Sequence, residues 1–137
     1  MAVKFILDTS VLTRMRFDQV RRVIRPIMSW GLAGRSTLSD LELGHSARNA
    51  TEWDRIRVGL ESLQAVDVRQ THVDRALEVQ RTLAERGLRG RPLPDLLIAA
   101  AAEECAATLV HYDRDFDLIA DVTGQPTRWA VVAGSID

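Results

Sequence analysis

The chain has 137 residues, which is the usual size of one domain with its own hydrophobic core, and we expect a single domain over residues 1–137. The formal net charge of −1 excludes an overall basic field that would attract nucleic acid by charge alone. Cys105 is the single cysteine, so a disulfide within the chain and a cysteine-based metal site are excluded, and we expect its thiol to be buried.

The first apolar run, Val3 to Leu7, is bounded by polar residues and predicts a buried strand. This run is too short for a signal peptide and meets Asp8 at once, and no stretch reaches the length of a membrane span, so we expect a cytoplasmic protein. Apolar spacing and stop signals predict the next elements in chain order: helix 10–15 with Ser10 as its cap, helix 18–30 with Asp18 as its cap, strand 35–38, helix 39–48 and helix 51–63.

The second half of the chain continues the alternation of strands and helices. The predicted elements are strand 65–68, helix 71–86, helix 95–107, strand 108–112, helix 116–120 and strand 127–132. Helix 71–86 has an apolar stripe of Val73, Leu77, Val79, Leu83 and Ala84. Helix 95–107 is nearly all apolar, so we expect it to be buried on most sides. Strands that alternate with helices predict a mainly parallel sheet covered on both faces, which is a three-layer α/β/α sandwich.

Four acidic residues stand at a predicted strand end or helix start. Asp8 and Asp113 follow strands directly, Glu42 lies in the first turn of a helix, and Asp95 opens the most apolar helix. Because chemistry in such folds collects at the carboxyl ends of the strands, we expect these acids to converge on one edge of the sheet. Neighbouring carboxylates repel each other unless a cation intervenes, and oxygen ligands suit Mg²⁺ or Mn²⁺. The pattern therefore favours metal-dependent chemistry on a phosphodiester.

Each acid also has a purely structural interpretation. The spacing from Ser39 to Glu42 matches a capping box, and Asp95 is an acceptable helix cap. Asp8 can form an Asx turn, and residues 113–117 can form a solvated turn. The position of all four acids at one edge of the sheet favours the functional interpretation.

The histidines and tryptophans give weaker signals. His45 follows Glu42 by one helical turn, and a single Glu-x-x-His pair favours a structural role over a metal site. His72 and His111 have no partner that the sequence identifies. The three tryptophans are widely spaced, which favours core packing over a surface for stacking bases: Trp30, Trp53 and Trp129.

Four blocks of the sequence, in order and across nearly the whole chain, resemble PIN-domain ribonucleases, particularly the toxins of VapBC toxin–antitoxin pairs. The blocks are FILDTSVL at 5–12, LSDLELG at 38–44, LPDLLIAAAA at 93–102 and YDRDF at 112–116. The resemblance implies an α/β/α domain and an endoribonuclease toxin of a type II toxin–antitoxin system that depends on Mg²⁺ or Mn²⁺. It also implies that the protein cleaves RNA such as tRNA or rRNA, forms a homodimer, and is neutralised by a cognate VapB-type antitoxin that covers the active site.

The resemblance also implies roles for individual residues. The catalytic quartet would be Asp8, Glu42, Asp95 and Asp113. The metal would be held by Asp8, Asp95 and Asp113, with Asp115 as a further possible ligand. Ser10 would support the first acid, while Asp115 and Asp117 compete with Asp113 for the place of the fourth. The chain departs from the family at His111, because a threonine often stands two residues before the fourth acid.

Four arginines fall in or near loops at the same edge and are candidates for phosphate contacts, with a solvated surface position as the simpler alternative: Arg14, Arg16, Arg89 and Arg91.

Two other functions compete with the ribonuclease as interpretations of the sequence. Asp8 after the first strand is typical of aspartate-nucleophile phosphatases, but the haloacid-dehalogenase pattern Asp-x-Asp has Ser10 in its second place here. A phosphoreceiver domain fits poorly because Lys4, the only lysine, is far from the late strand where that fold needs one. The non-enzymatic alternative is a catalytically silent PIN-like module that binds RNA or protein, and the intact quartet argues against it.

Overall fold

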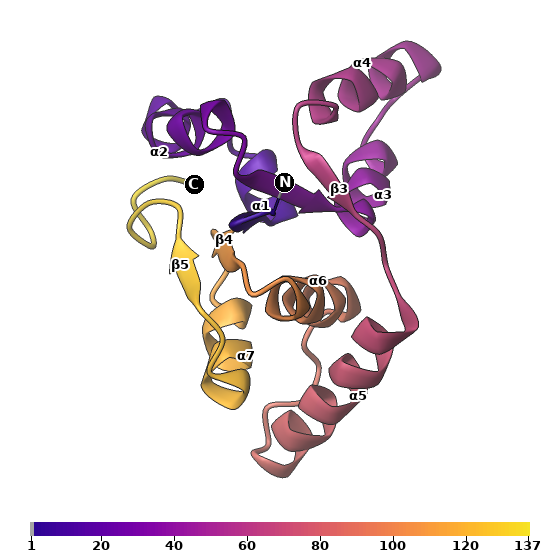
Figure 1. The fold of residues 1–137 in the computed structure, drawn as a ribbon, viewed down its shortest axis with the longest axis vertical. Helices are drawn as coiled ribbons and strands as arrows, with labels where there is room; N and C mark the ends of the chain where they lie inside the picture. Colours follow the sequence, from indigo (N-terminus) through magenta and orange to yellow (C-terminus); the bar gives the residue numbers. More distant parts are fainter. Residues whose placement is uncertain (1) are drawn as a thin grey trace.

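The structure is a computed structural model that describes residues 2–137, and it contains one parallel sheet between two layers of helices (Figure 1). The strands are β1 (Phe5–Leu7), β2 (Ala33–Ser36), β3 (Gln64–Val66), β4 (Thr108–His111) and β5 (Thr127–Trp129). The helices are α1 (Thr9–Leu12), α2 (Asp18–Ser29), α3 (Thr37–His45), α4 (Ala50–Leu60), α5 (Gln70–Glu85), α6 (Leu93–Glu104) and α7 (Asp115–Thr123).

The five strands lie in the order β3-β2-β1-β4-β5, and every neighbouring pair is parallel. The central strand β1 pairs with both β2 and β4, so that Ile6 lies between Gly34 and Leu109. The backbone N–H of Asp8 also donates to the carbonyl of Val110 at 2.9 Å. This register brings the residues that follow β1 and β4 to the same edge of the sheet, although about a hundred positions separate them in the sequence.

Successive strand residues point to opposite faces of the sheet, and each face has its own core. Ile6 and Leu109 belong to a buried cluster with residues of α5, α6 and α7. Leu7 and Val110 belong to a second cluster with residues of α1, α2 and α4. Figure 1 shows α5, α6 and α7 on one side of the strands and α2, α3 and α4 on the other. The predicted three-layer α/β/α sandwich is therefore confirmed, and α6 is buried on most sides, as expected.

The predicted order of the elements is correct, but the helix caps at the acidic edge are not those that the sequence indicated. Helix α1 begins at Thr9, and its cap is Asp8, whose carboxylate accepts the N–H of Ser10, so Ser10 is not the cap. Helix α3 begins at Thr37 and is capped by Ser36, so the helix predicted to start at residue 39 starts earlier. In both cases the true cap is the last extended residue before the helix, which apolar spacing alone does not locate.

Helices α2 and α6 also begin differently from the prediction. The cap of α2 is Phe17, without a side-chain hydrogen bond, and Asp18 is the first helical residue. Pro92 is the cap of α6, so Asp95 lies at the third helical position and does not cap the helix. A proline at the second helical position, Pro94, removes an N–H that has no partner inside the helix anyway, which lets the helix start earlier than expected.

Several expectations about burial are wrong. Trp30 and Trp53 are 64% and 46% exposed and do not belong to the core, and Cys105 is exposed at the end of α6. In α5, Leu77 is 58% exposed, and the positions that face the core are His72, Ala76, Val79 and Leu83. The stripe that faces the core is offset from the predicted stripe because α5 packs on α6 and α7 and lies away from the strands (Figure 1).

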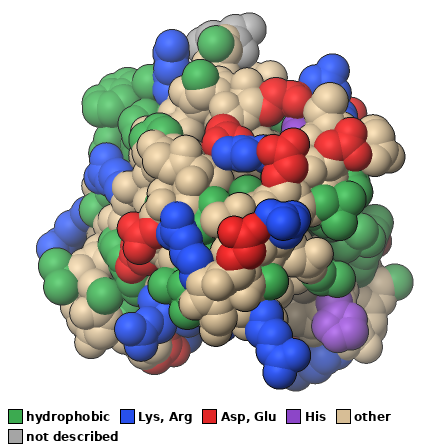
Figure 2. Space-filling model, turned by 90° about the horizontal axis from the view of Figure 1, so that it is seen from below, with side chains coloured by type: hydrophobic (Ala, Val, Ile, Leu, Met, Phe, Trp, Pro, Cys, Tyr) green, Lys and Arg blue, Asp and Glu red, His purple; other side chains and the backbone are tan. Residues whose placement is uncertain are grey.

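Charged side chains of both signs are interspersed with apolar side chains on the face that Figure 2 shows, as the near-zero net charge leads one to expect. Among the described residues, no helix combines the length and hydropathy needed to cross a bilayer.

Candidate active site at the carboxyl edge of the sheet

Asp8 and Ser10 join the ends of the two central strands. Asp8 Oδ2 accepts the backbone N–H of Ser10 at 2.9 Å and its hydroxyl at 2.6 Å. The Ser10 hydroxyl oxygen accepts the backbone N–H of Tyr112, which directly follows β4, at 2.9 Å. One serine side chain therefore orients the Asp8 carboxylate and ties it to the segment that carries Asp113.

Glu42 reaches the same edge from helix α3. It is the sixth residue of that helix and not part of its first turn, and Ser36 is the cap, so the capping box of Ser39 and Glu42 is not formed. Instead, Glu42 Oε1 accepts the hydroxyl proton of Thr9 at 2.7 Å, and the Ser39 hydroxyl lies 2.8 Å from the same Thr9 oxygen. Sequence reasoning missed Thr9; its position between Asp8 and Ser10 was the available signal.

Asp95, Asp113 and Asp115 form the other side of the cluster. Each offers a carboxylate oxygen, and the three oxygens lie within 4.8 Å of one another. Asp113 Oδ1 accepts the backbone N–H of Asp115 at 2.9 Å, which holds the first turn of α7 against the end of β4. Asp115 also accepts a hydrogen bond from Arg91 at 2.6 Å. Two of the three candidates for the fourth acid, Asp113 and Asp115, thus belong to the cluster.

Asp117 lies apart from these three acids and is occupied by another contact. Both of its carboxylate oxygens lie 3.2 Å from the indole N–H of Trp129, and its side chain is 53% exposed. The structure therefore separates Asp117 from the cluster, although the sequence alone did not distinguish it from Asp113 and Asp115.

Burial and mutual repulsion raise the pKa values of two acids at this site. The pKa of Asp8 is raised to about 6, mainly by burial, against the lowering effect of its hydrogen bonds from Ser10. The pKa of Asp95 is raised to about 8, first by burial and then by the negative charges of Asp8, Asp113, Asp115 and Glu42. Four other carboxylates raise the pKa of Asp95. The five acids, which come from three helices and two strand ends, therefore interact electrostatically with one another.

A divalent cation fits this arrangement. Asp8 Oδ1 and Asp95 Oδ2 are both buried and have no hydrogen-bond partner, which is costly for a carboxylate oxygen. A cation would supply the missing partner and remove the repulsion that raises the pKa of Asp95. Because the available donors are carboxylate oxygens, the site matches the preference of Mg²⁺ or Mn²⁺.

His111 lies underneath the segment that carries Asp113. Its ring is fully buried, and its Nδ1 accepts the backbone N–H of Asp113 at 3.2 Å. The proton of the neutral ring is therefore on Nε2, which lies 3.9 Å from an Asp117 oxygen. Burial lowers the pKa of His111, which favours this neutral form. The sequence identified no partner for His111, and this one is a local backbone contact that only the turn geometry creates.

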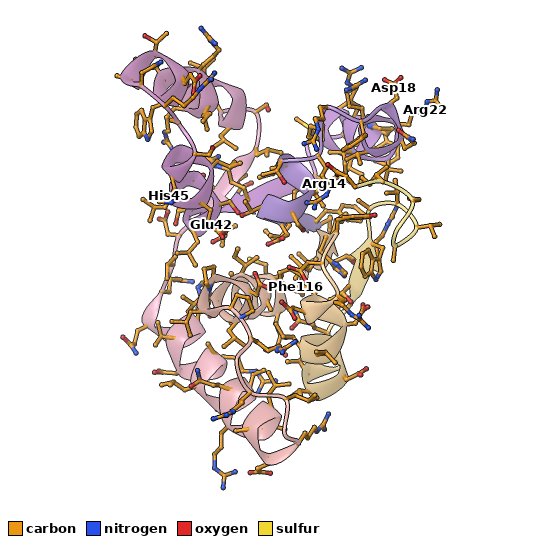
Figure 3. The ribbon with its side chains drawn as sticks, turned by 180° about the vertical axis from the view of Figure 1, so that it is seen from behind. Arg14, Asp18, Arg22, Glu42, His45 and Phe116 are labelled. Carbon is orange, nitrogen blue, oxygen red and sulfur yellow. The ribbon has the colours of Figure 1, made fainter. Side chains whose placement is uncertain are left out.

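The other two histidines occupy different environments. His45 is exposed on α3, one turn beyond Glu42 and on the same side of the molecule (Figure 3). His72 is buried, accepts the backbone N–H of Arg69 at Nδ1, and pairs through Nε2 with Glu104 of α6. His72 therefore joins α5 to α6 and is a structural residue.

The four candidate arginines differ in their surroundings. Arg14 donates to the carbonyl of Ser10 at 2.8 Å and lies over the Tyr112 ring, so it borders the Asp8 end of the site. Arg91 borders the opposite end through Asp115. Arg16 pairs with Asp137 at 2.5 Å, and Arg89 is exposed in the loop before α6. Two of the four arginines thus contact residues of the site directly.

The comparison with known proteins gives a consistent result. The sequence model of the PIN domain matches residues 5–122. The chain is 52% identical to "Ribonuclease VapC51" of Mycobacterium tuberculosis over 137 residues, which cover all of both chains. It is 37% identical to "Ribonuclease VapC21" of the same species over 139 residues, which cover 98% of this chain and 99% of that one.

Solved structures agree with this result at the level of the fold. DNA-bound VapBC from Salmonella typhimurium superposes with a TM-score of 0.78 at 20% identity, over 94% of this chain and 99% of that one. DNA-bound VapBC2 from Rickettsia felis gives 0.77 at 18% identity, over 93% of this chain and 98% of that one.

Proposed function

This chain belongs to the PIN-domain family and resembles its VapC ribonucleases throughout its length, and on that premise we propose that it is a metal-dependent endoribonuclease toxin. The observation that carries the proposal is the cluster of carboxylates at the sheet edge, in which buried oxygens of Asp8 and Asp95 lack a partner. Burying unpaired carboxylate oxygens lowers the stability of the fold, and a bound cation would supply the missing interaction.

Asp8, Asp95 and Asp113 would hold the metal, and Asp115 offers a further oxygen. When bound, a divalent ion lowers the pKa of a coordinated water and stabilises the charge that develops on a phosphodiester. The protein side chains set the geometry for this chemistry. Ser10 orients Asp8, and the Asp113 carboxylate is held by the N–H of Asp115.

We assign proton transfer to Glu42. Its carboxylate is exposed at the rim of the cluster and is oriented by the hydroxyl of Thr9. As the water oxygen bonds to phosphorus, one of its protons passes to Glu42, the bond from phosphorus to the leaving oxygen breaks, and the leaving oxygen takes up a proton from solvent. Arg14 and Arg91, at the two ends of the site, would contact the phosphates of the RNA, with Arg16 and Arg89 farther out.

We propose a VapB-type antitoxin as the natural partner. Several solved structures similar to the chain are VapBC complexes, and this chain has an apolar groove of about 330 Å³ that suits an amphipathic partner helix. Two methionines in its lining add an adaptable surface. The lining residues are Leu12, Met15, Met28, Leu43, Ile56, Gly59, Leu60 and Leu63.

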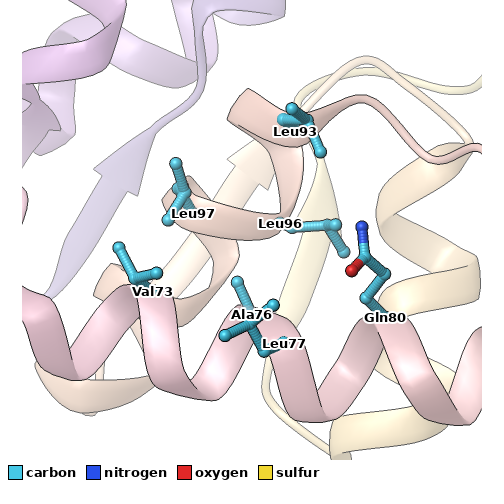
Figure 4. Close-up of a pocket in the computed structure, with 7 residues that line it drawn as sticks. All are labelled: Val73, Ala76, Leu77, Gln80, Leu93, Leu96 and Leu97. Atoms are coloured by element: carbon cyan, nitrogen blue, oxygen red, sulfur yellow. The ribbon is translucent and has the colours of Figure 1, made fainter.

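A second apolar surface supports a homodimer. A hollow of about 180 Å³ between α5 and α6 has a nearly apolar lining that includes Leu77, Leu93 and Leu97 (Figure 4). Leu77 and Leu93 are 58% and 63% exposed, which is costly for a surface that stays in water. We therefore propose that a second copy of the chain covers this face, and that tRNA or rRNA is the substrate of the resulting dimer.

The decisive test is cleavage of total RNA and of purified tRNA and rRNA by the isolated protein. We expect cleavage with Mn²⁺ or Mg²⁺, none with EDTA, and a loss of at least about 100-fold in Asp8→Asn and Asp95→Asn. The control is Asp121→Asn, an exposed acid of α7 outside the cluster. Metal-independent cleavage, or full activity of Asp95→Asn, would refute the mechanism, whereas RNA binding without cleavage would favour the silent binding module.

A further inference from the structure

A groove between α3 and α4, next to the acidic cluster, has the composition of a nucleotide-binding surface. It has a volume of about 490 Å³ and is lined by Asp40, Leu41, Gly44, His45, Trp53 and Arg57. We propose that this groove binds a base of the RNA substrate that flanks the scissile phosphodiester, with Trp53 as the stacking residue and Arg57 as the cation. This inference rests on the proposed ribonuclease function and adds a substrate subsite to it.

Trp53 is held at the wall of the groove by a close contact between the two helices. Its indole is 46% exposed, although a tryptophan on an amphipathic helix is usually buried. A Cβ atom at Gly44 would lie 2.8 Å from the indole Nε1 and 3.2 Å from Cδ1, so only glycine leaves room for this position of the ring. The packing of α3 against α4 therefore leaves the Trp53 ring partly exposed to solvent at the groove.

The two charged residues that line the groove, Asp40 and Arg57, form a cluster with the buried Arg35. Asp40 accepts two hydrogen bonds from the buried Arg35, at 2.7 and 3.1 Å, and one from Arg57 at 2.5 Å. One carboxylate thus faces two guanidinium groups, which leaves a local net charge of about +1. The Arg57 side chain is 42% exposed and its guanidinium lies 5.9 Å from the Trp53 ring centroid, so a partly exposed positive charge lies beside the aromatic surface.

The groove is continuous with the acidic cluster. Leu41 and His45 line it and also line the adjoining hollow of about 360 Å³, in which Glu42 takes part. Glu42 and His45 lie one turn apart on α3, as Figure 3 shows, which is a rise of about 4.5 Å along the helix axis. A nucleotide whose phosphate lies at Glu42 can therefore place a neighbouring base in the groove.

The chemistry of the groove favours RNA over a protein segment. Unpaired bases are bound by stacking on aromatic rings and guanidinium groups, and both groups are present here. A docked protein helix needs a mainly apolar groove, and the groove that includes Met15 and Met28 supplies one elsewhere on the chain.

The test compares Trp53→Ala and Trp53→Phe with Trp30→Ala, which removes an exposed tryptophan that follows α2 and does not line the groove. Binding is measured by fluorescence anisotropy with a labelled single-stranded oligoribonucleotide in the Asp95→Asn background, and kinetics in the wild-type background. We expect Trp53→Ala to weaken binding and raise KM by roughly five-fold or more, with kcat within about two-fold. Trp53→Phe should restore most of the affinity, and Trp30→Ala should change neither value.

Gly44→Ala supplies an independent variant that leaves Trp53 in place. The added methyl group must displace the indole, so RNA binding should weaken, whereas the melting temperature should hold or rise because alanine favours the helix. Unchanged RNA affinity in both Trp53→Ala and Gly44→Ala would overturn the subsite, even if the wild type cleaves RNA. If the wild type does not cleave RNA, the ribonuclease proposal fails. The anisotropy measurements of RNA binding still test whether the groove is a subsite. If Trp53→Ala lost antitoxin binding while its RNA affinity stayed unchanged, the RNA subsite would be refuted and the groove would be assigned to protein docking.

Discussion

At the scale of single residues, the most informative feature is a pair of buried acids with raised pKa values. Asp8 has a pKa of about 6 and Asp95 of about 8, against ordinary values near 3.8. Because the folded chain binds protons at these sites more tightly than the unfolded chain does, the free energy of unfolding falls as pH rises through this range. The metal-free fold is thus weakened at neutral pH by the residues that would hold the metal.

This linkage predicts a pH-dependent stabilisation by metal. Excess Mn²⁺ should raise the melting temperature more at pH 8 than at pH 5, since a cation competes with protons for the same carboxylates. Thermal melts followed by circular dichroism at both pH values, with and without Mn²⁺, measure the effect. Asp95→Asn should abolish most of the difference between the two pH values. An equal metal effect at both values would contradict the assignment of Asp8 and Asp95 as ligands.

His111 gives a second prediction at this scale. Its Nδ1 holds the backbone N–H of Asp113, so His111→Leu should misplace that carboxylate and weaken Mn²⁺ affinity by roughly 10-fold. His111→Asn keeps a side-chain acceptor near the same position and should retain more affinity than the leucine variant. Isothermal titration with Mn²⁺ measures both. If both variants lost Mn²⁺ affinity equally and their melting temperatures fell by similar amounts, the prediction would be contradicted. His111 would then act only through packing.

At the scale of elements, a buried ion pair bridges α3 and the neighbouring strand β2. Arg35 lies in β2, is 7% exposed, and donates to Asp40, to the carbonyl of Leu60 at the end of α4, and to the carbonyl of Leu63 in the turn that follows. Burial by itself would raise the pKa of Asp40, but the hydrogen bonds and charges of Arg35 and Arg57 outweigh it and lower the pKa. This pair therefore stabilises the fold above pH 4 and loses its effect as the pH falls through the lowered pKa of Asp40.

Asp40→Asn should consequently destabilise the protein by about 3 kcal/mol at pH 7, because it leaves the Arg35 charge buried without a counter-ion. Urea denaturation measures the change. The matched control is Glu85→Gln, which breaks the exposed pair with Arg81 on α5 and should cost less than about 0.5 kcal/mol. A loss in Asp40→Asn no larger than that of the control would show that the pair is not needed for the contact of α3 with β2.

The same elements show what could be predicted from the sequence. Hydrophobic runs located the five strands and seven helices of the described residues to within a few residues. This was possible because the periodic burial of a strand or helix is reflected in the spacing of its apolar residues. The caps of α1, α2, α3 and α6 were missed, since a cap is decided by the backbone angle of one residue where the chain enters the helix. The resulting shift moved Glu42 out of the first turn of its helix and excluded its capping-box role.

At the scale of the whole molecule, the exposed apolar face of α5 and α6 predicts self-association. Leu77→Lys with Leu93→Lys should convert a dimer to a monomer, because both charges would be buried in the interface. Size-exclusion chromatography with light scattering gives the mass directly. Val132→Lys is the control, since Val132 is 78% exposed and lies outside this face. A wild-type monomer at high concentration, or an unchanged dimer in the double variant, would refute this choice of interface.

The sequence by itself determined the α/β/α class, the order of the elements and the acids that could act, because hydrophobic periodicity and residue chemistry are local properties. The tertiary structure decided which acids meet: the parallel pairing of β1 with β4 places Asp8 beside the segment of Asp113 and leaves Asp117 with Trp129. It also decided that Trp53 lies exposed against Gly44 and that His111 lies beneath Asp113. These contacts join residues that tertiary packing brings together. The direction of a packed side chain depends on its neighbours in space, so sequence spacing and composition do not predict it.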